Sequence, residues 1–439
     1  MSSALFRPPS QWPVIAEVDV LVIGAGPGGL GAAVAAGRLG LKTLVVERYG
    51  FPGGVATVAS CPYLMGFAHG DRQIAGGVAD DLVRELDAMG EATFVTPANS
   101  MPEGRPIGDR PLLNNVITSV EGVRIAGNRL LKAAGVTCLY YTSLIGAVVE
   151  DGRVTAAAVD CVEGPGLIRA ACFVDASGDA HLVYRAGGKV VAGRPEDTMT
   201  KTILIRAGGV PEFDRPAVTE RFKKLVEEGR IPLKGQDRLM GLGLPNPGEV
   251  ELNFTLTGGD ALLSSELTRM DMEMREQILV ALDFFRKEIP GFADCYLVDA
   301  GAAVGVRAGR NIVGLETITQ TDIDEDTPVD EPIAVGTRGY GGHGLEGFAP
   351  SWGKWHAGTR GIPLKALIPV GFRNVMVAGR AISCEVRVIS TFRLMSRCMA
   401  IGQAAGVTAG LAVRDGCNVP EVSYGAVRDE LLAGKAILS

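Results

Sequence analysis

The sequence predicts an α/β fold built on a parallel β-sheet, and three neighbouring features near the N-terminus carry this prediction. Residues 19–23 (DVLVI) form a short β-branched apolar run, which is typical of a strand buried on both faces of a parallel sheet. A glycine-rich turn follows at residues 24–29, and small apolar residues continue through 30–40 (LGAAVAAGRLG), as expected of a closely packed helix. A second apolar run, residues 43–46, is closed by Glu47. This order predicts a βαβ unit.

The turn fits the spacing G-x-G-x-x-G at Gly24, Gly26 and Gly29. Glycine is needed there for the tight turn, for contact between backbone and a pyrophosphate, and for close approach of the helix, whose N-terminus faces the anion. Glu47 lies 23 residues after Gly24, where a carboxylate accepts hydrogen bonds from ribose hydroxyls. An acid at this position argues against a 2′-phosphate. The unit predicts a dinucleotide site, and by itself it does not separate FAD from NAD.

Composition limits the remaining possibilities. The chain has 439 residues, is 47% hydrophobic and carries a net charge of -7, which predicts two or three domains and disfavours nucleic acid as a partner. Eight cysteines are scattered without a C-x-x-C pair or a metal-ligand spacing, so we expect reduced cysteines and no metal. No signal-peptide pattern and no apolar run of about 18 residues occurs, which predicts a cytoplasmic protein without membrane insertion.

The rest of the chain favours a flavin over a nicotinamide. A glycine pair, Gly53-Gly54, follows soon after Glu47, whereas a simple dehydrogenase more often continues directly into its next helix. Residues 122–135 predict an amphipathic helix, and strand-like segments follow it up to the sequence DASGDA at 175–180. A third apolar strand, 374–378, leads into Gly379-Arg380, and a helix rich in small residues follows around 399–406.

These stretches resemble the FAD-dependent oxidoreductases of the glutathione-reductase-type fold, most closely a poorly characterised subfamily distantly related to the fumarate reductase flavoprotein and to geranylgeranyl reductases. The matching stretches, which span nearly the whole chain, are VLVIGAGPGGLGAA, VVERYGFPGG, the region 122–180, VGVRAGRNIVG, and VAGRAIS to GQAAG. The resemblance implies FAD as cofactor and a discontinuous Rossmann-like FAD-binding domain, α/β in class, with an inserted α+β substrate domain. It assigns residues 17–60, 120–190 and 360–425 to the FAD-binding domain and residues 61–119 and 191–359 to the substrate-binding domain.

Motif and resemblance together assign a set of residues to the cofactor. They are Gly24, Gly26, Pro27, Gly28, Gly29, Glu47, Arg48, Gly54, Val55, Ala176, Gly178, Asp179, Gly379, Arg380, Gly402 and Gln403. The chain departs from its relatives in two places. Many relatives end the last flavin strand in Gly-Asp, whose carboxylate contacts the ribityl chain; here the pair is Gly379-Arg380, which leaves Asp179 as a candidate for that contact. The histidine of close relatives is also absent from residues 384–397.

Candidates for catalysis are few, because the chain has only four histidines. His343, which matches a histidine position of the related subfamily, stands with Tyr340 in a glycine-rich stretch (RGYGGHG) that we expect to be a loop, and His356 follows an aromatic segment that could cover a flat substrate. Arg307 belongs to the VGVRAGR match and could hold a carboxylate or polarise a carbonyl. His343, His356, Arg307 and Tyr340 are therefore the predicted catalytic residues, and a solvated loop residue or a salt bridge remains the alternative for each. For Arg393, a salt bridge or a flavin phosphate contact is the favoured interpretation.

We expect an FAD-dependent oxidoreductase that transfers hydride between a small organic substrate and flavin N5, as a dehydrogenase or reductase. Two alternatives stay open: a flavin-dependent monooxygenase, and an electron-carrying flavoprotein that serves a partner protein. The length of the segment 191–359 favours a small-molecule substrate, since it suffices for a substrate domain. Within it, the acidic stretch 321–331 resembles a solvated loop. The sequence identifies neither the electron donor or acceptor nor the oligomeric state.

Overall fold

The predicted βαβ unit forms the middle of a larger sheet. The structure, a computed structural model, describes residues 7–9, 11–70, 72–95, 115–193, 199–344, 347 and 353–438. Strand β1 (Val14–Ile23) pairs in parallel with β2 (Thr43–Val46) on one side and with β11 (Gly164–Asp175) on the other. Strand β8 (Thr137–Leu139) extends the parallel part beyond β2, and β20 (Val375–Val377) extends it beyond the C-terminal half of β11.

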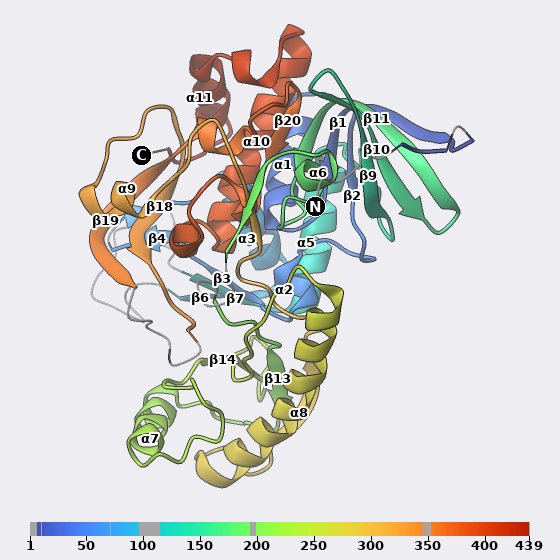
Figure 1. Ribbon diagram of the computed structural model, residues 1–439. Coiled ribbons are helices and arrows are strands. Elements are labelled where there is room, and N and C mark those ends of the chain that lie inside the picture. The colour runs from blue at the N-terminus through green and yellow to red at the C-terminus, as the bar shows by residue number, and fades with distance from the viewer. Residues whose placement is uncertain are drawn as a thin grey trace.

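The sheet is buried on both faces, as the β-branched strands predict. Val20 and Val22 of β1 belong to a large core with helices α1 (Pro27–Arg38) and α10 (Met395–Asp415). Leu21 and Ile23, which point the other way, belong to a second core with the antiparallel hairpin of β9 (Ser143–Glu150) and β10 (Arg153–Cys161). Helices α3 (Val78–Ala88), α5 (Val120–Ala133) and α11 (Tyr424–Ala433) pack onto the first core (Figure 1).

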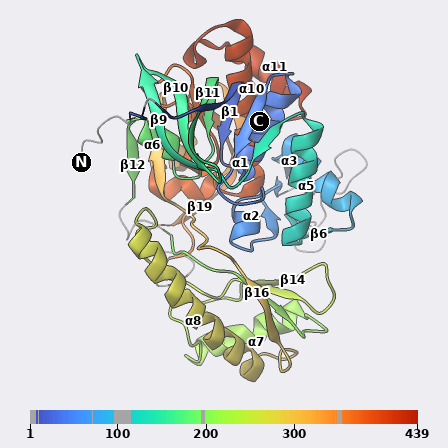
Figure 2. The ribbon, with the colours of Figure 1, turned by 90° about the vertical axis from the view of Figure 1, so that its right-hand side faces the viewer.

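A separate region lies at the far end of the molecule from this sheet (Figures 1 and 2). Its antiparallel sheet has the order β14 (Gly241–Gly243), β15 (Val250–Leu252), β13 (Ile205–Gly208) and β16 (Tyr296–Ala300). Helices α7 (Arg215–Glu227) and α8 (Ser264–Glu288) pack against it and form a core of their own with the strands. The mixed α/β architecture with an additional domain agrees with the predicted fold class, and the residue boundaries of the two domains stay a prediction.

The remaining elements connect these regions. The hairpin of β18 (Pro332–Tyr340) and β19 (Lys354–Pro363) packs beside α10, and helix α9 (Gln320–Glu325) lies against β18. The smaller elements are α2 (Val55–Val58), β3 (Tyr63–Met65), β4 (Ala68–His69), β5 (Arg72–Gln73), β6 (Ala92–Val95), β7 (Asn115–Thr118), α6 (His181–Arg185), β12 (Val190–Ala192), β17 (Arg310–Ile312), η2 (Leu364–Leu367), η3 (Gly379–Ala381), η4 (Val386–Thr391) and η5 (Val419–Glu421).

Two expectations for the segment 321–356 need correction. The acidic stretch is not a solvated loop throughout, because it begins inside α9, whose N-terminus is closed by a capping box between Thr319 and Asp322. Tyr340 does not lie in a loop either: it ends β18 and is 1% exposed. His356 lies inside β19, and Trp352 of the aromatic segment is outside the described residues.

Candidate functional site

The glycine turn between β1 and α1 packs against the ends of two other strands. Gly24 has a φ of 97°, and a Cβ there would lie 2.7 Å from the carbonyl oxygen of Ala176, just beyond β11. A Cβ on Gly28 would lie 2.8 Å from the backbone nitrogen of Gly379, just beyond β20, and one on Gly29 would lie 1.8 Å from the carbonyl oxygen of Gly24. The fold itself therefore requires these three glycines.

Gly26 is different, because nothing in the chain requires it to be glycine. Its φ of -70° suits any residue, and a Cβ there would have Gly54 Cα as its nearest neighbour, at an ordinary 3.7 Å. Gly26 is also the N-cap of α1, where no side chain accepts a hydrogen bond from the first N–H groups of the helix. The open space at a helix N-terminus fits a pyrophosphate that presses against the backbone.

Glu47 and the second glycine pair complete the surroundings of this turn. The buried Glu47 carboxylate accepts hydrogen bonds from the backbone N–H of Ala25 at 2.8 Å and of Tyr49 at 3.1 Å. Gly54 has a φ of 54°, and a Cβ there would lie 2.8 Å from Gly26 Cα, so this glycine is needed for the close approach. Val55 begins α2 directly after it, whereas the Arg48 side chain is exposed beside the ring of Tyr49.

Arg380, which stands where many relatives have an aspartate after the last flavin strand, pairs with a carboxylate from another loop. Arg380 donates hydrogen bonds to both carboxylate oxygens of Asp179, at 2.9 and 3.0 Å. Gly178, with a φ of 88°, leaves room for the guanidinium, which a Cβ would approach to 3.2 Å. The carboxylate that the motif lacks after β20 is thus supplied from the loop after β11, as one half of an ion pair. Asp179 stays the candidate for the ribityl contact, now together with Arg380.

Gly402 and Gln403 have packing roles that need no ligand. A Cβ on Gly402 would lie 2.0 Å from the carbonyl oxygen of Gly28, so this glycine lets α10 touch α1. The buried Gln403 amide accepts a hydrogen bond from the backbone of Val78 at 3.0 Å and donates one to the carbonyl oxygen of Gly434 at 3.0 Å. Their predicted cofactor contacts stay untested, and the end of α10 that presents free N–H groups begins at Met395.

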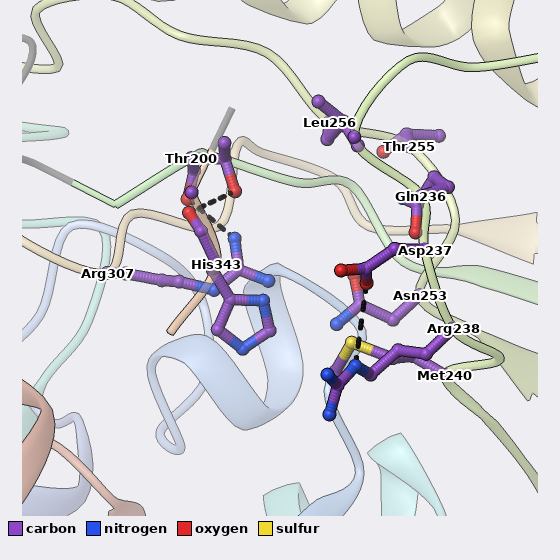
Figure 3. A pocket seen from close by; sticks show the side chains of 12 residues that line it. Thr200, Gln236, Asp237, Arg238, Met240, Asn253, Thr255, Leu256, Arg307 and His343 are labelled. Carbon is purple, nitrogen blue, oxygen red and sulfur yellow. Dashed lines mark hydrogen bonds and ion pairs between the residues drawn. The ribbon is translucent and has the colours of Figure 1, made fainter. Parts of the chain in front are cut away.

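Two of the predicted catalytic residues share a pocket, and Figure 3 shows both on one side of the view, with Asp237 and Arg238 on the other. Arg307 and His343 line this space of about 310 Å³ together with Thr200 and Asn253. Arg307 donates a hydrogen bond to the Thr200 carbonyl oxygen at 2.6 Å, and the His343 carbonyl oxygen accepts one from the Thr200 N–H at 2.8 Å. His343 has a φ of 57°, a left-handed conformation that is uncommon outside glycine and is often found at functional sites.

The pocket is strongly cationic. Burial, followed by the nearby charge of Arg393, lowers the pKa of Arg307 to about 9. Burial also lowers the pKa of His343 far below its usual value, and the charges of Arg307 and Arg393 act in the same direction. His343 is therefore an uncharged imidazole at neutral pH.

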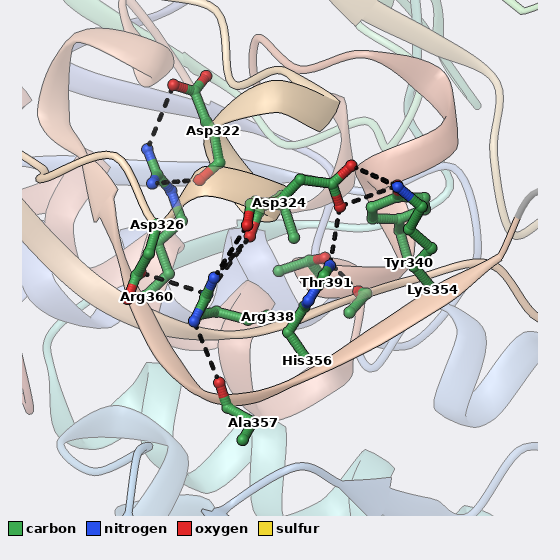
Figure 4. Close-up of polar contacts among 12 residues, drawn as sticks. Asp322, Asp324, Asp326, Arg338, Tyr340, Lys354, His356, Ala357, Arg360 and Thr391 are labelled. Atoms are coloured by element: carbon green, nitrogen blue, oxygen red, sulfur yellow. Dashed lines mark hydrogen bonds and ion pairs between the residues drawn. The ribbon is translucent and has the colours of Figure 1, made fainter.

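The other two predicted catalytic residues belong to a different cluster, around Asp324 of α9 (Figure 4). Tyr340 donates its hydroxyl to the Asp324 carboxylate at 3.1 Å, and Lys354 donates to the same carboxylate at 2.8 Å. His356 Nε2 lies 2.8 Å from Asp324 Oδ1. The hydrogen bond from Lys354 and those from His356 and Tyr340 lower the pKa of Asp324 to about 2. These contacts hold α9 against the β18–β19 hairpin.

Sequence reasoning missed the importance of two buried groups. Arg393 has no salt bridge to any described residue, and its Nε is buried without a hydrogen-bond partner, whereas the flavin phosphate contact that was the other predicted role stays a prediction. Glu251 of β15 is 4% exposed, and burial raises the pKa of its carboxyl to about 8. No sequence signal marks Glu251, and none shows that Arg393 lacks a charged partner, since both properties depend on the packing of segments that are distant along the chain.

Burial raises the pKa of the Cys61 thiol to about 12, so it stays protonated.

None of the helices in the described part of the chain is long and apolar enough to cross a membrane. Within the same residues there is no cluster of three or more histidine, cysteine or acidic side chains suited to a metal ion.

Comparisons with known proteins bear on these sites. The model of a family described as FAD dependent oxidoreductase matches residues 19–431. The chain is 33% identical over 155 residues to a tRNA uridine 5-carboxymethylaminomethyl modification enzyme of Desulfotalea psychrophila, covering 32% of this chain and 21% of that protein. It is 44% identical over 78 residues to the aklavinone 12-hydroxylase of Streptomyces purpurascens, covering 17% of this chain and 13% of that one. The matches therefore span only a small part of these curated relatives.

Among solved structures, a geranylgeranyl bacteriochlorophyll reductase-like protein from Thermoplasma acidophilum aligns with 96% of this chain and 84% of its own, at 15% identity and a TM-score of 0.49.

Proposed function

Because the chain belongs to the FAD dependent oxidoreductase family, we propose that it is a dehydrogenase or reductase, which moves hydride between a carbon of a small organic substrate and N5 of FAD. FAD supplies the electron-accepting ring when it is bound, so the chain has to bind it, hold the substrate beside it and handle one proton. Two sets of residues are suited to these tasks, the loops around the glycine turn and the pocket of Arg307 and His343.

The cofactor would lie where the ends of three parallel strands meet. Gly26 and the N-terminus of α1 would hold the pyrophosphate, and Glu47, at the end of β2, would accept hydrogen bonds from the adenosine ribose. Asp179 and Arg380 would contact the ribityl chain. The N-terminus of α10 would face the flavin's pyrimidine edge, where its partial positive charge favours the reduced anion. In this proposal residues 17–60, 120–190 and 360–425 form the FAD-binding domain.

The position of the Arg307 pocket carries the proposal of a substrate site. Arg307 lies in a segment that touches two of the cofactor loops: a Cβ on Gly301 would meet the backbone of Ala59, next to α2, and one on Gly309 would lie 2.0 Å from the Asp179 carboxylate. A substrate held by Arg307 would therefore lie close to the loops proposed for FAD. His343, uncharged and in the same pocket, would offer a hydrogen bond to the substrate and accept its proton once an anion offsets the neighbouring arginines.

A catalytic role for His356 and Tyr340 is the weaker proposal. Their polar groups are directed at Asp324, and neither residue lines the pocket of Arg307. We therefore propose His343 and Arg307 as the residues that contact the substrate.

Monooxygenation is a second candidate, favoured by the 78-residue match to the aklavinone hydroxylase. The two candidates differ in the use of oxygen. A dehydrogenase is reduced by its substrate without air, whereas a monooxygenase needs an external reductant first and then consumes oxygen with its substrate.

The test is an absorbance spectrum of the purified protein, with chromatographic identification of the released cofactor and anaerobic titration with candidate substrates. We expect released FAD and a substrate that, in the absence of oxygen and of any partner protein, either bleaches the oxidised flavin or reoxidises the reduced flavin. A flavin that candidate substrates never bleach, but that NADH or NADPH reduces and a substrate with oxygen reoxidises, would favour the monooxygenase. A colourless protein that binds NAD would contradict both.

A further inference from the structure

Three arginines, Arg307, Arg393 and Arg397, have no counter-ion among the described residues. Arg307 is 9% and Arg397 is 3% exposed, and the Nε of Arg393 is buried. No carboxylate of the described chain lies within ion-pair distance of any of the three. Arg307 and Arg397 each donate one hydrogen bond to a backbone carbonyl, at 2.6 and 2.8 Å, whereas the Arg393 guanidinium has no hydrogen bond to described residues. Burial of unpaired cations is costly, so the fold keeps this charge at the expense of stability.

The charge of Arg393 acts on both of the other arginines. The charge of Arg393 lowers the pKa of Arg307 and that of Arg397, in both cases after the larger effect of burial. The same charge acts on His343. Arg397 lies in the first turn of α10 and Arg393 directly before the N-cap Leu394, near the positive partial charge of the helix N-terminus. The cluster therefore repels further cations and attracts an anion.

No acidic side chain among the described lining residues of the pocket pairs with the positive charge of Arg307. Asp237 is the one acid among its lining residues, and its carboxylate pairs with Arg238 at 3.5 Å (Figure 3). Asn253, Thr200, Gln236 and Thr255 add neutral hydrogen-bonding side chains to the lining, and Met240 and Leu256 add apolar ones. This combination suits a small ligand with one ionised group and further polar groups.

We propose that the substrate is an organic acid whose carboxylate is bound by Arg393 and Arg307, with the rest of the molecule in the pocket beside His343. The planar guanidinium of Arg393 matches a carboxylate in a bidentate arrangement, and charge-assisted hydrogen bonds of this kind are among the strongest in proteins. The inference rests on the proposed oxidoreductase function, because it names the substrate class of that same site. A neutral amide of the same shape would leave the buried charge unpaired and bind poorly.

The test uses the FAD-loaded protein and two matched pairs of probes, benzoate with benzamide and succinate with succinamide. Binding is followed by calorimetry and by perturbation of the flavin spectrum. We expect at least one carboxylate to bind and its amide to bind at least about tenfold more weakly. Arg393→Gln should weaken binding of that carboxylate by about tenfold or more, with FAD content unchanged. The control is Arg428→Gln, which alters an exposed arginine of α11 that pairs with Asp429 and should bind normally.

Each other outcome is decisive. Equal binding of acid and amide, or no binding of either carboxylate, overturns the proposal. Loss of FAD from Arg393→Gln with carboxylate binding retained also overturns it, because the arginine then serves the cofactor. If that variant does not fold, Arg307→Lys replaces it and should weaken carboxylate binding by removing the planar donor. Calorimetry can also be performed on protein stripped of FAD. Carboxylate binding to a protein that never contains flavin would contradict the oxidoreductase function and leave the carboxylate site intact, so the two failures can be distinguished.

Discussion

The four glycines of the turn between β1 and α1 are needed for different reasons. Gly24, Gly28 and Gly29 are pressed against backbone atoms of the chain, at distances that a Cβ would reduce to between 1.8 and 2.8 Å. At Gly26 the nearest atom would be 3.7 Å away. A substitution at Gly26 therefore separates the requirement of the ligand from the requirement of the fold.

We expect Gly26→Glu to fold and to lose FAD, with affinity reduced by about tenfold or more, because the added carboxylate would occupy and repel the pyrophosphate position. The measurement is the ratio of flavin to protein absorbance together with far-UV circular dichroism. Gly425→Glu is the matched control, since Gly425 is exposed on α11 and a Cβ there would meet only Ser423 Oγ at 3.6 Å. A folded Gly26→Glu protein that retains FAD would contradict the placement of the site.

Glu251 gives a prediction about pH. Its folded-state pKa of about 8 lies above the usual 4.5, so the folded protein binds more protons than the unfolded chain between these values. Stability should then fall as pH rises from about 5 to about 8, with a slope of up to about 1.4 kcal/mol per pH unit. Glu251→Gln removes the titrating group, so its advantage over the natural protein should grow across this range and vanish near pH 4. Chemical unfolding at several pH values measures the difference, and parallel curves for the two proteins would refute the assignment.

At the scale of elements, the contact between α1 and α10 depends on glycines on both helices. A Cβ on Gly31 would lie 2.2 Å from the carbonyl oxygen of Met399, and one on Gly406 would lie 2.1 Å from that of Ala32. The helices thus touch through their backbones, in the layer that also fixes Gly28 beside Gly379. The geometry of the proposed pyrophosphate site follows from this packing.

Gly406→Ala should therefore destabilise the protein by about 1–3 kcal/mol, although alanine is the better helix former, because the methyl group forces the helices apart. Gly425→Ala, in an exposed helical position, should have the opposite sign and stabilise by up to about 1 kcal/mol. Denaturant unfolding of the two variants measures both effects. Stabilisation of both would show that the helices tolerate separation.

The elements also show what sequence reasoning can reach. Strand β2 lies where the apolar run 43–46 predicted it, because a run of β-branched and apolar residues is a local signal. The cluster around Asp324 was not predictable, since it depends on the register that places Tyr340 opposite Lys354 across the β18–β19 hairpin. The effect of the Arg393 charge on Arg307 likewise joins segments 86 residues apart and needs the tertiary fold. Motifs predicted the cofactor loops, and only packing revealed the unpaired charge.

The described chain forms two regions that have separate hydrophobic cores. One region includes the sheet, with a core on each of its faces, and the other lies between residues 203 and 295, where Phe222, Phe254, Phe284 and Phe285 pack ring against ring. The proposed cofactor contacts all lie in the first region, and the pocket of Arg307 lies where the second region meets it.

This arrangement predicts a selective effect of FAD on unfolding. A ligand that binds only the folded sheet region stabilises it by about 2.7 kcal/mol at a hundredfold excess over Kd, whereas a region that makes no contact gains nothing. In calorimetry of protein stripped of FAD we expect two transitions, of which added FAD raises only one. The Gly26→Glu variant should show the same two transitions without the shift. A single transition raised by FAD would mean that the two regions unfold together. Two transitions that FAD does not shift would refute the cofactor site, because FAD bound at the glycine turn must stabilise the region that contains this turn.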